Sequence, residues 1–134
     1  QYDSFPGILG SAVTRYDGLT LSMTGLSETE ARKFGFDVIS STMTKKDKAG
    51  YMPSAENITI KLIADRRTKK ILGAQSIGSG DADKRVNTVA SAIQADQTID
   101  EFLHLDMTYA PPFSTAVDPL LSAALVINNQ LFKP

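Results

Sequence analysis

Short runs of alternating apolar and polar residues recur through the first 80 positions, and each of these runs predicts a β-strand. Isoleucine, valine, threonine and other β-favouring residues gather in five runs, which polar or glycine-containing segments separate. The predicted strands are residues 11–16, 19–24, 38–44, 58–63 and 71–77. Asp17-Gly18 indicates a tight hairpin between the first two, because both turn positions need a positive φ. The charged segment 65–70 predicts a longer hairpin between the last two.

Helical signals are confined to four segments. Two have the capping-box spacing of Ser or Thr followed three residues later by Glu, and one begins at an Asp-Pro pair. The fourth places apolar residues at i, i+3, i+4 and i+7. The predicted helices are residues 28–34, 82–95, about 99–105 and 120–129. Because the strands run together instead of alternating with helices, we expect an α+β fold with a mostly antiparallel sheet flanked by helices.

The ends of the chain differ in character. Residues 1–10 follow neither period and predict a linker, whereas residues 11–134 predict one domain. The last predicted helix is apolar on both sides, with Leu121 and Leu125 on one and Leu120 and Val126 on the other. Such a helix is normally covered on both sides, so we expect a second subunit or a neighbouring domain against it.

Composition excludes several kinds of chemistry. The 134 residues include no cysteine, one histidine, 14 Lys+Arg and 15 Asp+Glu, for a net charge of −1. Disulfides, thiolate nucleophiles and sites with several histidine or cysteine ligands are therefore excluded, and no metal site is predicted. The balanced charge argues against a nucleic-acid partner, and no apolar run reaches the length of a membrane span. We expect a cytoplasmic protein.

Two isolated features offer weak evidence for a site. Gly78-Ser79-Gly80 lies between a predicted strand and a predicted helix, where an anion could bind, but it lacks the third glycine of a dinucleotide fingerprint. An ordinary strand-to-helix turn explains it better. His104 could serve a hydrolase only beside a nucleophile and a carboxylate, and no such spacing surrounds it. A histidine at a helix end is the simpler interpretation, and Asp100, Glu101 and Asp106 are interpreted as cap and surface groups.

The most unusual segment is residues 107–114, Met-Thr-Tyr-Ala-Pro-Pro-Phe-Ser. Each proline fixes its own φ and holds the preceding residue extended. Tyr109 and Phe113 therefore lie on a stiff, non-helical loop. Such a loop can present a phenol at a site, or it can be a connector whose rings fill the core, and the residues alone leave both possibilities open.

Several motifs together resemble one family. Segments 24–31 (TGLSETEA), 61–75 (KLI…ILGAQ), 92–101 (AIQA…TIDE) and 105–114 (LDMTYAPPFS) occur in the order found in the C-terminal dimerisation domain of FAD-dependent pyridine nucleotide-disulfide oxidoreductases. The last of them resembles the coenzyme A-disulfide reductase and NADH oxidase branch. The resemblance covers about residues 5–131. It implies that FAD and NAD(P)H domains, with the redox-active cysteine, precede this domain in the parent polypeptide.

The resemblance also implies roles for particular residues. In that branch, two tyrosines reach the partner subunit's cysteine and flavin across a homodimer. They match Tyr109 and Tyr51, although Met52 and Ser54 stand where the family motif has a second tyrosine and a glycine. Ala110, Pro111, Pro112 and Phe113 would then lie near the partner's flavin. The substrate would be coenzyme A disulfide or a related persulfide, and this chain alone would bind no FAD and be inactive.

The chemistry of the phenol agrees with this implied role. A tyrosine with a pKa of about 10 is protonated at neutral pH and can donate a hydrogen bond. A sulfur departing from a cleaved disulfide gains negative charge, which a placed O–H stabilises. Two alternatives stay open: the same domain in an oxygen-reducing NADH oxidase, and a stand-alone interaction module with no enzymatic parent.

Overall fold

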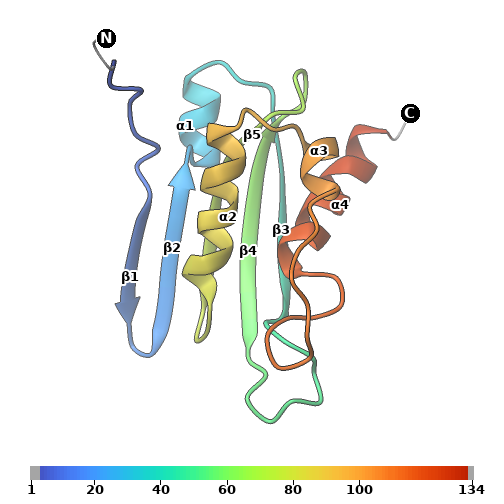
Figure 1. Ribbon diagram of the computed structural model, residues 1–134. Helices are drawn as coiled ribbons and strands as arrows, with labels where there is room; N and C mark the ends of the chain where they lie inside the picture. Colours follow the sequence, from blue (N-terminus) through green and yellow to red (C-terminus); the bar gives the residue numbers. More distant parts are fainter. Residues whose placement is uncertain (1–3, 133–134) are drawn as a thin grey trace.

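The computed structural model describes residues 4–132 and is built on a five-stranded antiparallel sheet (Figure 1). The strands are β1 (Ala12–Tyr16), β2 (Leu19–Gly25), β3 (Val38–Lys46), β4 (Asn57–Asp65) and β5 (Ile71–Gly78). Their order across the sheet is β1-β2-β5-β4-β3, so β1 and β3 form the two edges. The α+β class with an antiparallel sheet is confirmed.

The bounds of the helices are α1 (Glu28–Lys33), α2 (Ala82–Gln94), α3 (Ile99–Leu103) and α4 (Pro119–Leu131). Helices α2, α3 and α4 cover one face of this sheet, and α1 lies on the other face. Helix α2 packs on β2 and β5, α4 packs on β3 and β4, and α3 packs against α4. Both long helices begin at the same end of the sheet, the lower end in Figure 1.

The main core fills the space between the sheet and these helices. On β4, every second residue from Ile58 to Ala64 is buried, as expected for a strand with one face inward. The helices contribute the residues that complete the cluster: Val89, Ala92, Ile99, Phe102, Leu120, Ala123, Ala124 and Ile127. A smaller cluster around Ala31, Val38 and Ile63 attaches α1 to the opposite face.

Local signals located the elements well. Asp17 and Gly18 have φ angles of 48° and 75°, the left-handed values that the hairpin signal predicts. Ser27 and Thr98 each form the predicted capping box with the glutamate three residues on. Several boundaries were wrong by two residues. Helix α3 ends at Leu103 rather than near Leu105, and His104 caps it. Strands β3 and β4 and helix α4 each extend two residues beyond their predicted ends, to Lys46, Asp65 and Leu131.

The proposed linker, residues 1–10, stays a prediction. Residues 1–3 lie outside the described part of the chain, as do residues 133–134. Residues 4–10 form no helix or strand, but Leu9 accepts a backbone hydrogen bond from Gly25 at 3.0 Å. This segment therefore reaches the end of β2.

Two glycines allow the backbone at the end of β2 to lie very close to the start of β5. A Cβ added to Gly73 would lie 2.1 Å from the backbone oxygen of Leu26, and one added to Gly25 would lie 2.3 Å from that of Leu72. Gly25 also has a φ of 66°, which side chains disfavour. Backbone atoms cannot move aside as a flexible side chain can.

We therefore expect Gly73→Ala to lower the free energy of unfolding by about 3 kcal/mol, because the added methyl group overpacks the turn. Urea unfolding followed by circular dichroism measures this change. Gly50→Ala is the matched control: its added Cβ meets no atom within 4 Å, and we expect a change below about 0.5 kcal/mol. Equal stability of the two variants would contradict the close approach.

A carboxylate connects α1 to the uncovered face of the sheet. Hydrogen bonds from Lys61 (2.7 Å), Arg32 (2.8 Å) and Ser40 (3.0 Å), of which the one from Lys61 contributes most, lower the pKa of Glu28 from 4.5 to about 2. Because its pKa is lower in the folded state, the ionised carboxylate stabilises the fold above its unfolded pKa. This contribution is lost as the pH falls from about 4.5 towards 2.

Glu28→Gln should therefore lower the free energy of unfolding by about 1 kcal/mol at neutral pH, the scale of a partly exposed ion pair. As the pH falls through about 2 this difference should disappear, because the carboxylate becomes protonated in the folded state as well as in the unfolded state. Urea unfolding at the two pH values measures this. Glu56→Gln serves as control, since its side chain makes no hydrogen bond within residues 4–132. A stability difference for Glu28→Gln that persists at low pH would contradict the assignment.

Candidate functional site

Two loops from distant parts of the chain meet at the end of the sheet where α2 and α4 begin. The Tyr51 loop (residues 47–56) joins β3 to β4, and the Tyr109 loop (residues 104–118) joins α3 to α4. Both descend to the lower end in Figure 1. The backbone N–H of Ala49 donates to the carbonyl of Pro111 at 3.1 Å, which connects them directly.

The Tyr51 loop is closed at its base. The backbone N–H of Asp47 donates to the carbonyl of Glu56, and the N–H of Glu56 donates to Asp47 Oδ1, both at 2.9 Å. Beyond this base the loop projects outward, and Tyr51 is 76% exposed. Its ring is therefore available to another surface.

The Tyr109 loop presents its rings rather than burying them. Tyr109 is 53% exposed and Phe113 is 74% exposed. The carbonyl of Ala110 accepts hydrogen bonds from the N–H groups of Phe113 (2.9 Å) and Ser114 (3.1 Å), which forms a tight turn around the two prolines. Of the two possibilities left open by the sequence, a core-filling connector does not fit these exposures.

The backbone link limits the separation of the two tyrosines. Tyr51 lies two residues after Ala49, and Tyr109 lies two residues before Pro111. Two fully extended residues span about 7 Å, so the two Cα atoms can be no more than about 22 Å apart across the bond. Residues separated by 58 positions in the sequence thus lie on two connected loops at the same end of the molecule.

Sequence reasoning missed the residue that lies beneath both loops. Arg85, near the start of α2, is only 8% exposed. Its Nη2 donates to the carbonyl of Asp47 at 2.9 Å, and its Nε donates to the carboxylate of Asp118 at 3.1 Å. A signal was present, because Arg85 precedes Val89 by four residues and therefore lies on the apolar side of the helix.

The structure gives no support to a catalytic role for His104 or to anion binding at the Gly78-Ser79-Gly80 turn. His104 is exposed, and its Nδ1–H donates to the carbonyl of Asp100 within its own helix at 2.7 Å. At the Gly78-Ser79-Gly80 turn, the Cβ position of Gly80 lies 2.8 Å from Asp47 Oδ2. A carboxylate therefore lies where an anion would have to bind. Asp100 is a surface group that forms a 3.2 Å ion pair with Lys69. Glu101 is a cap group, in the capping box with Thr98.

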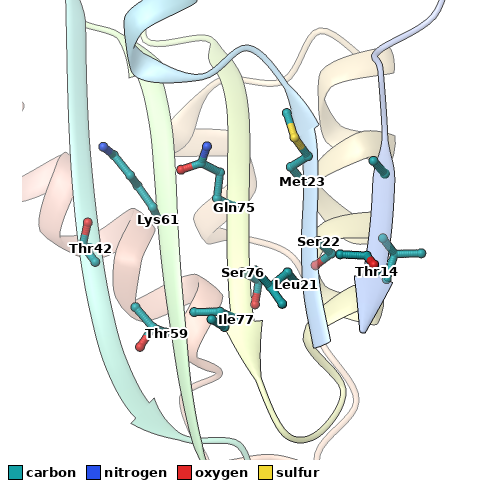
Figure 2. Close-up of a pocket in the computed structure, with 12 residues that line it drawn as sticks. Thr14, Leu21, Ser22, Met23, Thr42, Thr59, Lys61, Gln75, Ser76 and Ile77 are labelled. Atoms are coloured by element: carbon teal, nitrogen blue, oxygen red, sulfur yellow. The ribbon is translucent and has the colours of Figure 1, made fainter. Parts of the chain in front are cut away.

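The uncovered face of the sheet carries a hollow of about 530 Å³ (Figure 2). Apolar atoms make up most of its surface, and Leu21 and Met23 of β2 and Ile77 of β5 contribute side chains to it. Lys61 and Gln75 border it on the neighbouring strands. This face lies outside the two tyrosine loops, and its apolar character is typical of a surface that another domain covers.

Neither a membrane-spanning helix nor a metal site is present in residues 4–132. The described helices include none with the length and apolar character needed to cross a membrane. Within the same residues, no three histidine, cysteine, aspartate or glutamate side chains gather in a way that could hold a metal ion.

Comparison with known proteins decides the family. Residues 11–120 match the model of the pyridine nucleotide-disulphide oxidoreductase dimerisation domain. The chain belongs to this family. The prediction from the sequence motifs is therefore confirmed at the level of family and fold.

Individual relatives share the domain at moderate identity. The chain is 37% identical over 123 residues to an NAD(P)H coenzyme A polysulfide/persulfide reductase of Pyrococcus horikoshii, covering 92% of this chain and 27% of that protein. It is 26% identical over 114 residues to a coenzyme A disulfide reductase of Staphylococcus epidermidis, covering 85% of this chain and 26% of the other. The dimerisation domain thus spans about a quarter of the length of these relatives.

Solved structures of relatives contain a domain with the same fold. An NAD-dependent persulfide reductase from A. fulgidus superposes with a TM-score of 0.92 at 35% identity, covering 97% of this chain and 24% of that one. A water-forming NADH oxidase from Lactobacillus brevis gives 0.89 at 26% identity, covering 93% and 28%. Members of the family thus include persulfide reductases and NADH oxidases, so the fold alone does not select the reaction.

Proposed function

We propose that this chain is the dimerisation domain of a flavin-dependent NAD(P)H:disulfide oxidoreductase and lends Tyr51 and Tyr109 to the active site of its partner subunit. The observation that carries the proposal is the Ala49–Pro111 hydrogen bond, which joins two loops that each expose a tyrosine. A stand-alone interaction module would have no need to bring these two rings together.

The proposed chemistry uses the phenols as hydrogen-bond donors. When a disulfide is cleaved, the departing sulfur gains negative charge. A neutral phenol beside it stabilises that charge or supplies the proton. Stiff loops lower the entropic cost of holding the donors in place, and the prolines at 53, 111 and 112 provide that stiffness.

The cofactors are expected outside this chain. The glycine-containing turn before α2 faces the Asp47 carboxylate, whose negative charge does not fit a dinucleotide phosphate. FAD and NAD(P)H are therefore assigned to the other domains of the parent polypeptide. Ala110, Pro111, Pro112 and Phe113 form an exposed or half-exposed turn that would border the partner's flavin without enclosing it.

The substrate class follows from the relatives. The persulfide reductases are 35–37% identical to this chain, whereas the coenzyme A disulfide reductase and the NADH oxidase are both 26% identical. We therefore propose a coenzyme A persulfide, or the chemically related coenzyme A disulfide, as the substrate, with oxygen reduction as the second candidate. Reduction of disulfides by NAD(P)H suits the reducing cytoplasm, the expected location.

The test of the tyrosines uses the full-length flavoenzyme that contains this domain. Tyr51→Phe combined with Tyr109→Phe should slow reduction of coenzyme A disulfide about 10- to 100-fold, the scale of a lost hydrogen-bond donor in an active site. Reduction of the flavin by NAD(P)H, followed by stopped-flow absorbance, should be unchanged. Oxygen consumption by the same preparation distinguishes the second candidate.

Tyr16→Phe is the matched control, because Tyr16 is 78% exposed on β1, at the opposite edge of the sheet from β3. It should leave both rates unchanged. If disulfide turnover by the Tyr51/Tyr109 double variant equals that of the Tyr16 variant, the proposed role of the tyrosines is wrong.

A homodimer is the arrangement that the family name implies, and α4 offers a surface for it. Leu125 is 47% exposed although its helix is otherwise largely buried on the sheet side. The helix also begins directly after the Tyr109 loop, so a contact on α4 would bring that loop close to the partner subunit. We propose that Leu125 lies in the dimer interface.

Leu125→Glu should convert the dimer to a monomer, because burying an unpaired carboxylate at the interface is unfavourable. Light scattering coupled to size-exclusion chromatography measures the mass. Gln130→Glu, which adds the same charge at an exposed position of the same helix, should leave the dimer intact. A Leu125→Glu protein that stays dimeric would place the interface elsewhere.

A further inference from the structure

A buried ion pair lies directly behind the two tyrosine loops. Arg85 Nε donates to both carboxylate oxygens of Asp118, at 3.1 and 3.3 Å. The side chains are only 9% and 12% exposed. Both charges are therefore largely removed from water.

Each carboxylate oxygen of Asp118 accepts two hydrogen bonds. Besides Arg85, Oδ1 accepts the backbone N–H of Leu120 at 2.8 Å, which caps α4. Oδ2 accepts the hydroxyl of Ser114 at 3.1 Å. The aspartate thus joins the end of the Tyr109 loop, the start of α4 and the side of α2.

Arg85 also donates a hydrogen bond to the Tyr51 loop. Arg85 Nη2 donates to the carbonyl of Asp47, the residue that closes the base of the Tyr51 loop. The same guanidinium therefore binds both loops at once. Lysine could not do this, because its compact ammonium lacks the planar array of donors.

Stability alone is a poor explanation for this arrangement. Buried ion pairs contribute little net stability, because desolvation offsets their attraction, and apolar residues of similar size often serve as well. An apolar residue at position 85 would fill the same space but hold neither loop. The geometry thus favours orientation of the loops over stabilisation of the core.

We propose that Arg85 and Asp118 are positioning residues that fix the Tyr51 loop against the Tyr109 loop, so that the two phenols keep one relative placement. This inference rests on the proposed function for its catalytic consequence. Its structural part, the coupling of the loops, stands on the contacts within this chain.

Hydrogen exchange tests the coupling without reference to activity. The reporter is the amide of Ala49, whose hydrogen bond to Pro111 bridges the loops. In the ¹⁵N-labelled 134-residue chain, Asp118→Asn should speed exchange of this amide about tenfold. Asparagine keeps an oxygen to cap α4 but loses the charge that pairs with Arg85. Loss of one partner of a buried pair also lowers global stability, so amides in the centre of β4, such as Ile60, serve as the reference: they should still exchange more slowly than Ala49, which shows that exchange at Ala49 arises from local opening of the loops.

Two further variants make the result specific. Arg85→Lys keeps the positive charge but loses the planar donors, and it should speed exchange at Ala49 to a similar extent. Asp100→Asn removes a different ion pair, the 3.2 Å contact with Lys69, and should leave Ala49 unchanged. Unchanged exchange at Ala49 in both Asp118→Asn and Arg85→Lys, with folding intact, overturns the proposal.

The catalytic consequence is tested in the full-length flavoenzyme. Asp118→Asn should lower kcat for disulfide reduction about fivefold to tenfold while flavin reduction by NAD(P)H keeps its rate. If the Arg85–Asp118 pair acts through the tyrosines, adding Asp118→Asn to the Tyr51→Phe/Tyr109→Phe double variant should lower kcat by less than a further twofold. A full additional loss in that background overturns the positioning role.

The two proposals fail in different ways. Wild-type turnover in the Tyr51/Tyr109 double variant would refute the proposed function, whereas faster exchange at Ala49 in Asp118→Asn would still support the coupling of the loops. Normal exchange at Ala49 with a slow Tyr51/Tyr109 double variant would refute the coupling and leave the proposed function in place.

Discussion

Burial of only one face of the sheet by long helices is the constraint on which the rest of this domain depends. Strand β5 ends at the lower edge of the molecule, so α2 must start there and run back across β2 and β5. The connection from α3 returns to the same edge before α4 crosses β3 and β4. Two helix starts and two long loops therefore share one end of the molecule. The opposite face is left largely uncovered, with an apolar hollow that a larger protein can fill.

Local chemistry made most of the fold predictable. Capping boxes at Ser27 and Thr98, the Asp17-Gly18 turn and the alternation along β4 depend on neighbours within a few residues, so the sequence displays them directly. Burial of Arg85 and its bonds to Asp47 and Asp118 depend on segments 33 and 38 residues away. No local pattern records such contacts. The two prolines drew attention to Tyr109 from the residues alone, whereas Tyr51 was found only because its motif resembles that of a family. The connection between their two loops was found only in the structure.

Family membership and reaction are separate conclusions for this chain. The domain fold is shared by persulfide reductases and an NADH oxidase, and the chain spans about a quarter of its curated relatives. In the proposed function, this chain supplies two phenols on proline-containing loops and a helix for the dimer contact, and electron transfer is assigned to other domains. Differences between reactions in this family must then arise either in those other domains or in the few side chains that the two loops carry.

The closed base of the Tyr51 loop has an evolutionary consequence. Paired bonds between Asp47 and Glu56 complete the β3–β4 ladder before the loop begins, so the eight residues between them do not affect the register of the sheet. Their identity can drift without endangering the fold. Under the proposed function, substitutions in this short segment would alter which thiol compound is preferred while the scaffold stays the same.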